Sequence, residues 1–177
     1  MPKVLIISDS HGWESELLEI KERHQHEVEA MIHCGDSELL HSSEELSGMN
    51  VVKGNMDNDD NLPEEIDFTV DNLHFFVAHG HMHQIKFTLQ PISYRGDEVG
   101  ANVVCFGHSH IAGAEKAENK LFINPGSIRL PRSQHPGSYA ILSANRDLSD
   151  VIVQFYTKDG QEISALTYQT SLKTQQV

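Results

Sequence analysis

The chain has 177 residues, of which 38% are hydrophobic and 22% are charged, and its formal net charge is −13 at pH 7. This length and composition are typical of a single globular domain that buries its own core. The acidic charge argues against stable nucleic-acid binding, because such binding depends on Lys and Arg side chains that neutralise phosphates.

The first predicted elements are a strand, a helix and a second strand. Residues 4–7 are four consecutive aliphatic residues, which is typical of a strand buried on both faces. Apolar residues at helical spacing predict a helix over residues 13–25, and an apolar run predicts the second strand at 30–34. This order predicts a right-handed βαβ unit with its two strands parallel.

A short helix and a third strand are expected next. Ser37 is a suitable N-cap and Gly48 a suitable C-terminal stop, so we expect a helix over residues 37–46. A short strand then follows at residues 51–53.

The rest of the chain is predicted to be mainly strands. Pro91 is expected to divide or end a helix between residues 84 and 99. Two-residue turns at 71–72 and 118–119 predict hairpins. The predicted strands are 66–70, 73–78, 103–106, 114–117, 121–124, 139–143 and 151–156. We expect one domain over residues 1–172 and a polar tail over 173–177.

The location expected from the sequence is the cytoplasm. The N-terminus runs directly into the first predicted strand, and no apolar run is long enough to cross a bilayer. Cys34 and Cys105 each lie inside an apolar run, where a free buried thiol is expected. We therefore predict a protein that neither enters a membrane nor uses disulfides.

Ligand-type side chains follow five of the predicted strands. Asp9 and His11 are two residues apart, so if the extended geometry continues past the strand their side chains leave the backbone on the same side. The carboxyl ends of core strands are where open α/β sheets place their sites. The full set of strand-end residues is Asp9, His11, Asp36, Asn55, His79, His108 and His110.

This set of seven groups predicts a centre with two divalent metal ions. Carboxylate, imidazole and amide groups without thiolate suit Mn, Fe, Zn or Ni better than a structural zinc or an iron–sulfur cluster. Seven groups are too many for one ion, whereas two ions that share a carboxylate need about this number and keep open positions for water and substrate. Each residue alone has a simpler explanation, such as an N-cap for Asp9 or a turn for Asp36, but such explanations account poorly for all seven together.

Five short blocks, in this order, resemble a known family. They are Asp-x-His at residues 9–11, Gly-Asp at 35–36, Gly-Asn-x-Asp at 54–57, His-Gly-His at 79–81 and Gly-His-Ser-His at 107–110. Together they resemble the calcineurin-like metallophosphoesterases, and the turn at 124–127 makes the chain similar to their small bacterial phosphodiesterase branch of the YfcE type. The resemblance implies an α/β fold in which two mixed β-sheets are sandwiched between helices.

The resemblance also implies how the metal ions are held. It assigns Asp9, His11, Asp36 and His110 to one ion, and Asp36, Asn55, His79 and His108 to the other, with Asp36 bridging them. Mn²⁺ is the first expectation for both ions, with Fe, Zn, Ni or Co as alternatives. A hydroxide held between the two ions would then attack the phosphorus of the substrate.

Two further residues receive catalytic roles from the resemblance. Asp57 is expected to orient Asn55 or a neighbouring group from outside the ligand shell. Many relatives have a His between the Asn and the Asp, where it assists the leaving oxygen, but this chain has Met56. His81 is a candidate to replace that His as a proton donor or phosphate contact.

The predicted function is therefore hydrolysis of small phosphodiesters by a metal-dependent enzyme. Met56 favours a diester over a monoester, because a monoester with a poor leaving group needs more protonation. The alternatives are a phosphomonoesterase, a nuclease of the same fold, and a non-catalytic metal-bearing scaffold for protein binding. The Ser127 hydroxyl near the metals and a substrate contact by Arg129 or Arg132 also remain open, as does a role for His83. The histidines expected to be only structural are His24, His26, His33, His41, His74 and His135.

Overall fold

The computed structural model describes residues 1–174, which form strands, two α-helices and two short 3₁₀ helices, η1 and η2. In chain order these elements are β1 (Lys3–Ile7), α1 (Ser15–His24), β2 (Ala30–His33), η1 (Glu44–Leu46), β3 (Asn50–Val51), β4 (Glu65–Val70), β5 (Leu73–Ala78), α2 (Gln90–Val99), β6 (Val103–Cys105), β7 (Gly113–Ala117), β8 (Lys120–Asn124), β9 (Ser138–Ala144), β10 (Val151–Thr157), η2 (Ser164–Leu166) and β11 (Tyr168–Thr170).

The strands form two mixed sheets. One sheet has the order β11-β10-β9-β1-β2-β3 and the other has the order β4-β5-β6-β8-β7. Strand β1 pairs in parallel with β2, which confirms the predicted βαβ unit, and antiparallel with β9. Both predicted hairpins are confirmed, because Val70 pairs with Leu73 and Ala117 pairs with Lys120.

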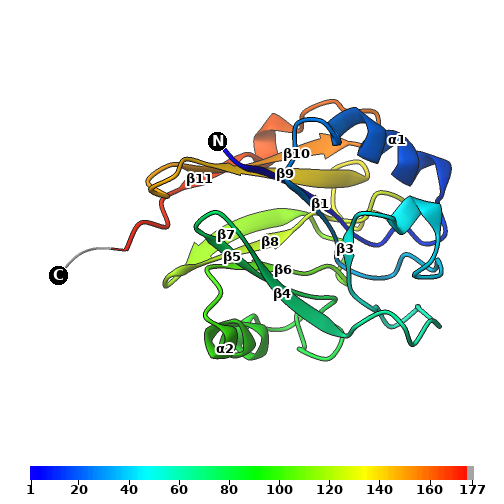
Figure 1. The fold of residues 1–177 in the computed structure, drawn as a ribbon, viewed down its shortest axis with the longest axis horizontal. Helices are drawn as coiled ribbons and strands as arrows, with labels where there is room; N and C mark the ends of the chain where they lie inside the picture. The colour runs from blue at the N-terminus through cyan, green and yellow to red at the C-terminus, as the bar shows by residue number, and fades with distance from the viewer. Residues whose placement is uncertain (175–177) are drawn as a thin grey trace.

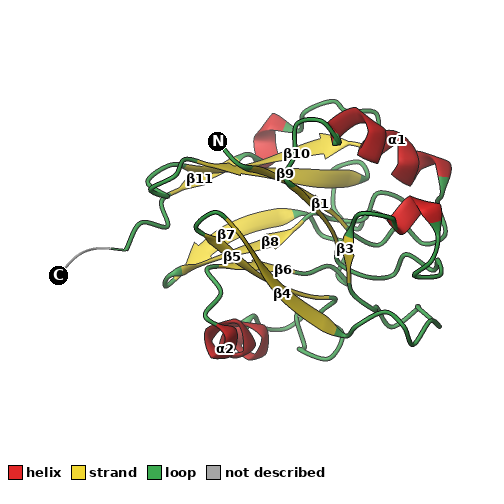
Figure 2. Cartoon of the chain, viewed as in Figure 1, coloured by secondary structure: helices red, strands yellow, loops and turns green. Residues whose placement is uncertain are grey.

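The two sheets pack face to face, with one helix outside each of them. Figure 1 shows α1 on the outer face of the first sheet and α2 on the outer face of the second, and Figure 2 shows that strands fill the space between the helices. The inner core combines side chains of both sheets, such as Ile6 of β1 and Val77 of β5. Separate outer clusters hold Leu17 and Ile20 of α1, and Ile92 of α2. The α/β fold with two mixed sheets, expected from the resemblance, is confirmed.

The helix predicted over residues 37–46 is wrong. Only the short turn η1 forms there, and Glu38 has a φ of 55°, which no right-handed helix allows. Carboxylates from a later loop hold this segment in another conformation: Asp57 accepts the N–H of Glu38, and Asp59 accepts the N–H of His41. The Ser37 hydroxyl closes a local turn by accepting the N–H of Leu39. Tertiary hydrogen bonds thus replace the predicted helix.

Smaller differences occur later in the chain. The helix expected between residues 84 and 99 begins at Gln90, and Pro91 lies in its first turn, where a missing N–H costs nothing. Strand β11 was not predicted, and it pairs antiparallel with β10. Residues 175–177 of the predicted polar tail lie outside the described residues. In the described part of the chain, no helix has the length and apolar character that a membrane crossing requires.

Candidate metal centre

The seven predicted ligands lie in loops that leave the carboxyl ends of strands from both sheets. Asp9 and His11 follow β1, Asp36 follows β2, and Asn55 follows β3. His79 follows β5, and the pair at 108 and 110 follows β6. Because β1 to β3 are parallel and β5 is parallel to β6, each sheet delivers its ligands at one edge.

Left-handed backbone conformations turn these side chains toward one another. The φ values are 53° at Asp9, 43° at His11, 57° at Asp36, 68° at His108 and 60° at His110. Such values are uncommon outside glycine, and they are concentrated at functional sites. The expectation that Asp9 and His11 align through continued extended geometry is therefore wrong, because β1 ends at Ile7. The two side chains meet through a turn.

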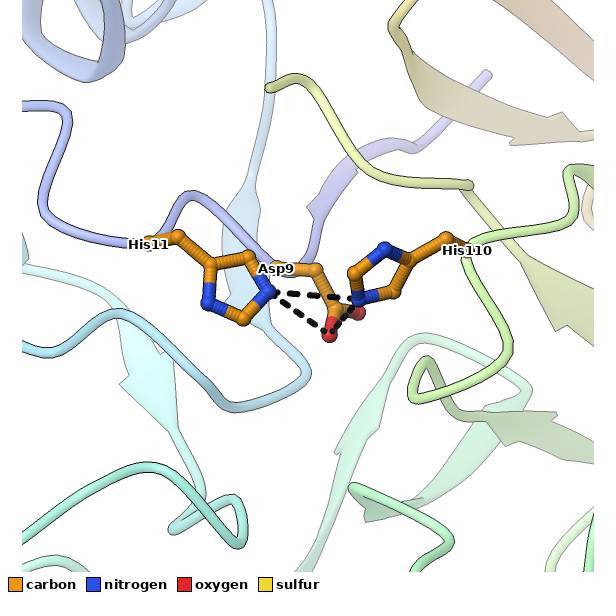
Figure 3. Close-up of side chains that lie close together, drawn as sticks. All are labelled: Asp9, His11 and His110. Carbon is orange, nitrogen blue, oxygen red and sulfur yellow. Dashed lines mark hydrogen bonds and ion pairs between the residues drawn. The ribbon is translucent and has the colours of Figure 1, made fainter. Parts of the chain in front are cut away.

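One group of possible ligands consists of Asp9, His11 and His110. Figure 3 shows the two imidazoles approaching the carboxylate from opposite sides. Asp9 Oδ1 lies 3.1 Å from His110 Nε2 and 3.7 Å from His11 Nε2. The two Nε2 atoms are 3.2 Å apart. Three potential ligand atoms therefore face one small volume.

A second group shares Asp9 and adds Asp36 and His79. His79 Nε2 lies 3.2 Å from Asp36 Oδ2 and 3.8 Å from Asp9 Oδ1. Asp9 Oδ1 and His79 Nε2 are both buried, and no described residue gives either of them a hydrogen bond. In these groups the shared carboxylate is that of Asp9. The assignment of Asp36 as the bridging ligand stays a prediction.

Each of the three imidazoles is held through its other ring nitrogen. His110 Nδ1 donates to the carbonyl of Leu130 at 2.8 Å, and His79 Nδ1 donates to the carbonyl of Cys34 at 2.8 Å. His11 Nδ1 donates to the Glu38 carboxylate at 3.0 Å. In the neutral imidazoles these bonds leave the lone pair on Nε2, facing the carboxylates, as metal-ligating histidines require. The orphaned atoms and the tautomers both fit divalent cations at this place.

The pKa shifts show how closely these groups interact. Burial raises the pKa of Asp9, but contacts with His11 and His110 outweigh burial and hold it well below its usual range. Contact with Asp9 raises the pKa of His11. Burial lowers the pKa of His79, but the nearby carboxylates of Asp36 and Asp9 outweigh it and the net shift is upward. Because imidazole must be neutral to bind a metal, these raised histidine pKa values would make ion binding at this place depend on pH.

The remaining predicted ligands, Asn55 and His108, lie at the same place but outside those two groups. Both line a cleft of about 430 Å³ together with His11, Asp36 and His110. The ring of His108 lies 5.1 Å from that of His79, centroid to centroid. Burial and the neighbouring His79 lower the pKa of His108 to about 4, which keeps the ring in the neutral form that ligates metals. The structure thus brings five of the seven predicted residues to one cleft, and the other two, Asp9 and His79, lie buried directly beside His11, Asp36 and His110.

Asp57 supports the ligand loops rather than facing the cleft. It is buried, and its Oδ2 accepts the N–H of Asp36 at 2.9 Å and that of Gly54 at 2.7 Å. Its Oδ1 accepts the N–H of Glu38 at 2.7 Å. The carboxylate therefore joins the loop that carries Asp36 to the loop that carries Asn55.

His81 lies beside the metal centre. Its ring is 5.5 Å from the ring of His79 and 6.2 Å from that of His108, centroid to centroid. Burial, followed by the proximity of His79, lowers the pKa of His81. Met56 is exposed and lines the cleft.

Sequence reasoning missed two side chains that support the ligand loops. His33, expected to be only structural, is fully buried, and its Nε2 donates to Ser10 Oγ at 2.8 Å, between the predicted ligands Asp9 and His11. Its Nδ1 accepts the N–H of Gly35 at 3.1 Å, immediately before Asp36. The signal for this role was the position of His33 at the end of a core strand. Glu38, which orients His11, gave no signal in the sequence.

The turn at 124–127 has a supporting role. The buried Ser127 hydroxyl donates to the carbonyl of Asp9 at 2.7 Å and accepts the N–H of Leu130 at 2.8 Å. Leu130 in turn holds His110 through its carbonyl. Ser127 thus ties together the loops of two ligands.

Three cations lie at the cleft. Its lining includes Lys86, Arg129 and Arg132. Arg129 also donates to the carbonyl of His11 and lies over the Trp13 ring at 5.8 Å. In a chain with a net charge of −13, these cations create a local attraction for an anion.

Comparison with known proteins gives consistent results. The model of the calcineurin-like phosphoesterase superfamily domain matches residues 2–147. The probable metallophosphoesterase YsnB of Bacillus subtilis is 51% identical over 169 residues, which cover 96% of this chain and 99% of that protein. The phosphodiesterase MJ0936 of Methanocaldococcus jannaschii is 32% identical over 143 residues, which cover 70% of this chain and 82% of that protein. The crystal structure of a predicted phosphoesterase from Streptococcus pneumoniae superimposes with a TM-score of 0.91 at 33% identity, covering 96% of this chain and 97% of that one.

Proposed function

The chain belongs to the calcineurin-like phosphoesterase superfamily, and we propose that it hydrolyses small phosphodiesters with two bound divalent metal ions. The observation that carries this proposal is the pair of Asp/His groups around Asp9, whose buried Oδ1 has no hydrogen-bond donor among the described residues. A buried carboxylate oxygen without a partner is costly unless a cation occupies the space beside it.

The ligand residues divide between two ions in this proposal. Asp9, His11, Asp36 and His110 hold one ion, while Asp36, Asn55, His79 and His108 hold the other. Two bound divalent ions supply Lewis acidity, which activates a water molecule and neutralises phosphate charge. Mn²⁺ is the proposed ion because the ligands are carboxylate, amide and imidazole groups without thiolate.

The other residues of the cleft attract and orient the substrate. Lys86, Arg129 and Arg132 place positive charge where the phosphate would enter. Asp57 fixes the loops of Asp36 and Asn55 through its three backbone hydrogen bonds. The three cations position the phosphate, and Asp57 positions the loops that carry the ligands, so all four residues affect where the phosphate lies relative to the ligands.

A diester is favoured over a monoester for two reasons. Met56 cannot donate a proton, so the exposed cleft position beside Asn55 gives no help to a poor leaving group. In addition, the relative MJ0936 is named as a phosphodiesterase. His81 is the proposed donor of a hydrogen bond to the leaving oxygen or the phosphate, because its ring lies next to those of His79 and His108.

We place the protein in the cytoplasm. The supporting observation is that Cys34 and Cys105 are both free and buried, as is usual in a reducing compartment.

The test begins with protein stripped by a chelator. Bis-p-nitrophenyl phosphate and p-nitrophenyl phosphate are assayed in parallel after Mn²⁺, Ni²⁺, Zn²⁺, Co²⁺ or Mg²⁺ is added back. We expect no turnover without metal, restoration by Mn²⁺, and faster hydrolysis of the diester. A preference for the monoester would contradict the diester assignment. Two bound ions with no turnover of either ester would instead indicate a metal-bearing scaffold.

Variants test the ligand assignment in the same assay. Asp36→Asn and His108→Ala should each lower kcat/KM by about a hundredfold or more, since even residues that only support a ligand contribute about 10- to 100-fold. The matched controls are Asp59→Asn and His26→Ala, which change the same residue types outside the cleft and should leave kcat/KM unchanged. Near-normal activity of either ligand variant, with the fold intact, would contradict the two-metal mechanism.

A further inference from the structure

A second cavity lies next to the metal cleft, on the outer face of the sheet that contains β6, β7 and β8. Its volume is about 520 Å³. Its walls are largely apolar and include Phe106, Phe122, Leu89 and Ile111. Phe106 and Phe122 belong to the cluster that packs against α2, so the cavity is the open end of that outer core. Nothing in the proposed two-metal chemistry uses this cavity.

Two cations connect the cavity to the metal cleft. Lys86 and Arg132 line both spaces. A ligand whose anionic group lies among the metal ligands therefore has an apolar wall directly beyond these cations. The predicted metal ligands, the two cations and the apolar wall thus lie in this order in space. In an acidic chain, this arrangement complements a molecule that is anionic at one end and apolar at the other.

We propose that this cavity, the ester pocket, binds an aromatic ester group of the phosphodiester substrate while the phosphate lies in the metal cleft. This inference rests on the proposed function and adds the substrate class to it. An aromatic group fits because Phe106 and Phe122 are among the lining residues, and contacts between aromatic rings add to the stabilisation from burial. A second anionic group fits poorly, because the lining includes the Glu115 carboxylate.

Exposed apolar side chains lie at both the ester pocket and the metal cleft. Ile111 in the ester pocket is 52% exposed, and Leu130 in the metal cleft is 49% exposed. Large apolar residues left half in water on the rim of a site gain stabilisation when a ligand covers them. This observation favours an apolar substituent on the substrate over a small hydrophilic one.

Gly113 offers a way to fill the ester pocket without touching the metal ligands. It lies on the edge strand β7, lines the pocket, and a β-carbon built on it would meet no atom within 4 Å. Its φ lies outside the left-handed region, so Gly113→Phe should fold without backbone strain. The matched control is Ala117→Phe, which is exposed on the same strand but does not line the pocket.

The experiment measures binding of two inert ligands to the metal-loaded full chain by calorimetry. Phenylphosphonate and methylphosphonate differ only in the group next to the phosphorus, and neither has an ester bond to hydrolyse. We expect the wild-type chain to bind phenylphosphonate about tenfold more tightly, because burying a ring removes a large apolar area from water. Gly113→Phe should remove this preference and leave the affinity for methylphosphonate unchanged, while Ala117→Phe should keep it.

Other outcomes separate the possible failures. Two results would overturn the assignment of the ester pocket. One is equal affinity of the wild-type chain for the two phosphonates, and the other is an equal loss of affinity for both phosphonates in Gly113→Phe. Failure of both phosphonates to bind to metal-loaded wild-type protein would contradict the proposed function itself. Ile111→Ser gives a second test that adds no bulk: it should weaken phenylphosphonate binding and spare methylphosphonate. Circular dichroism on each variant verifies the fold.

Discussion

The substitution Asp57→Asn separates a supporting role from a chemical one. The wild-type carboxylate accepts three backbone N–H groups, from Asp36, Glu38 and Gly54, at 2.9, 2.7 and 2.7 Å. An amide has nearly the same shape but only one oxygen, so it can keep at most the two bonds that share an oxygen. Its NH₂ group would then face the N–H of Glu38, and two donors would be left opposed.

The expected cost follows from those contacts. The part-buried N–H of Glu38 costs about 1–3 kcal/mol when it loses its acceptor, and each of the two remaining bonds loses about 1 kcal/mol of charge assistance. We therefore expect Asp57→Asn to lower the free energy of unfolding by about 4 kcal/mol. For a domain of this size, that corresponds to a fall in Tm of roughly 8–16 °C.

Denaturant unfolding and metal titration measure the two consequences. Because both carboxylate oxygens are engaged by the ligand loops, the variant should bind Mn²⁺ more weakly and recover most of its activity at saturating metal. Asp59→Asn is the control, since Asp59 accepts the backbone N–H groups of His41 and Asn61 away from the metal ligands. Wild-type stability and metal affinity in Asp57→Asn would refute the reasoning. A fall in kcat that saturating metal does not reverse would instead show a direct part in the chemistry.

Three further results are expected. Chelation should destabilise the protein, and Mn²⁺ at a hundredfold excess over its Kd should raise the free energy of unfolding by about 3 kcal/mol; an unchanged Tm would argue against the centre. Burial lowers the pKa of His33 to about 4, so the unfolded chain, with its ordinary His pKa of about 6.5, binds the proton more tightly. Stability should therefore fall by about 3 kcal/mol as the pH drops from about 6.5 to about 4, and His33→Asn should show a shallower pH dependence in urea unfolding; an identical slope would contradict this. Burial also raises the pKa of Cys34 and Cys105, so a disulfide reagent at pH 8 should label neither thiol in the native chain and both after denaturation; rapid native labelling would contradict their burial.

Local sequence patterns were sufficient for the elements whose stabilising contacts are close in the chain. The four aliphatic residues 4–7 predicted a strand buried on both faces, and the turns at 71–72 and 118–119 joined strands that pair with their immediate neighbours. The ligand types were also readable, because carboxylate, amide and imidazole groups stood where strands end. By contrast, the helix predicted over residues 37–46 failed, because its backbone donors pair with Asp57 and Asp59, some twenty residues away.

The orientation of the predicted ligands and their surroundings depend on contacts between distant segments. The left-handed turns at Asp9 and His11, and the carbonyls of Cys34 and Leu130 that orient His79 and His110, depend on loops from both sheets meeting at one edge. The ester pocket likewise gathers residues of four separate segments, and Lys86 and Arg132 link it to the metal cleft. The types of side chain available to the site could be predicted from the sequence, because they belong to individual residues. The geometry of the site came from contacts between distant segments, which no local pattern encodes.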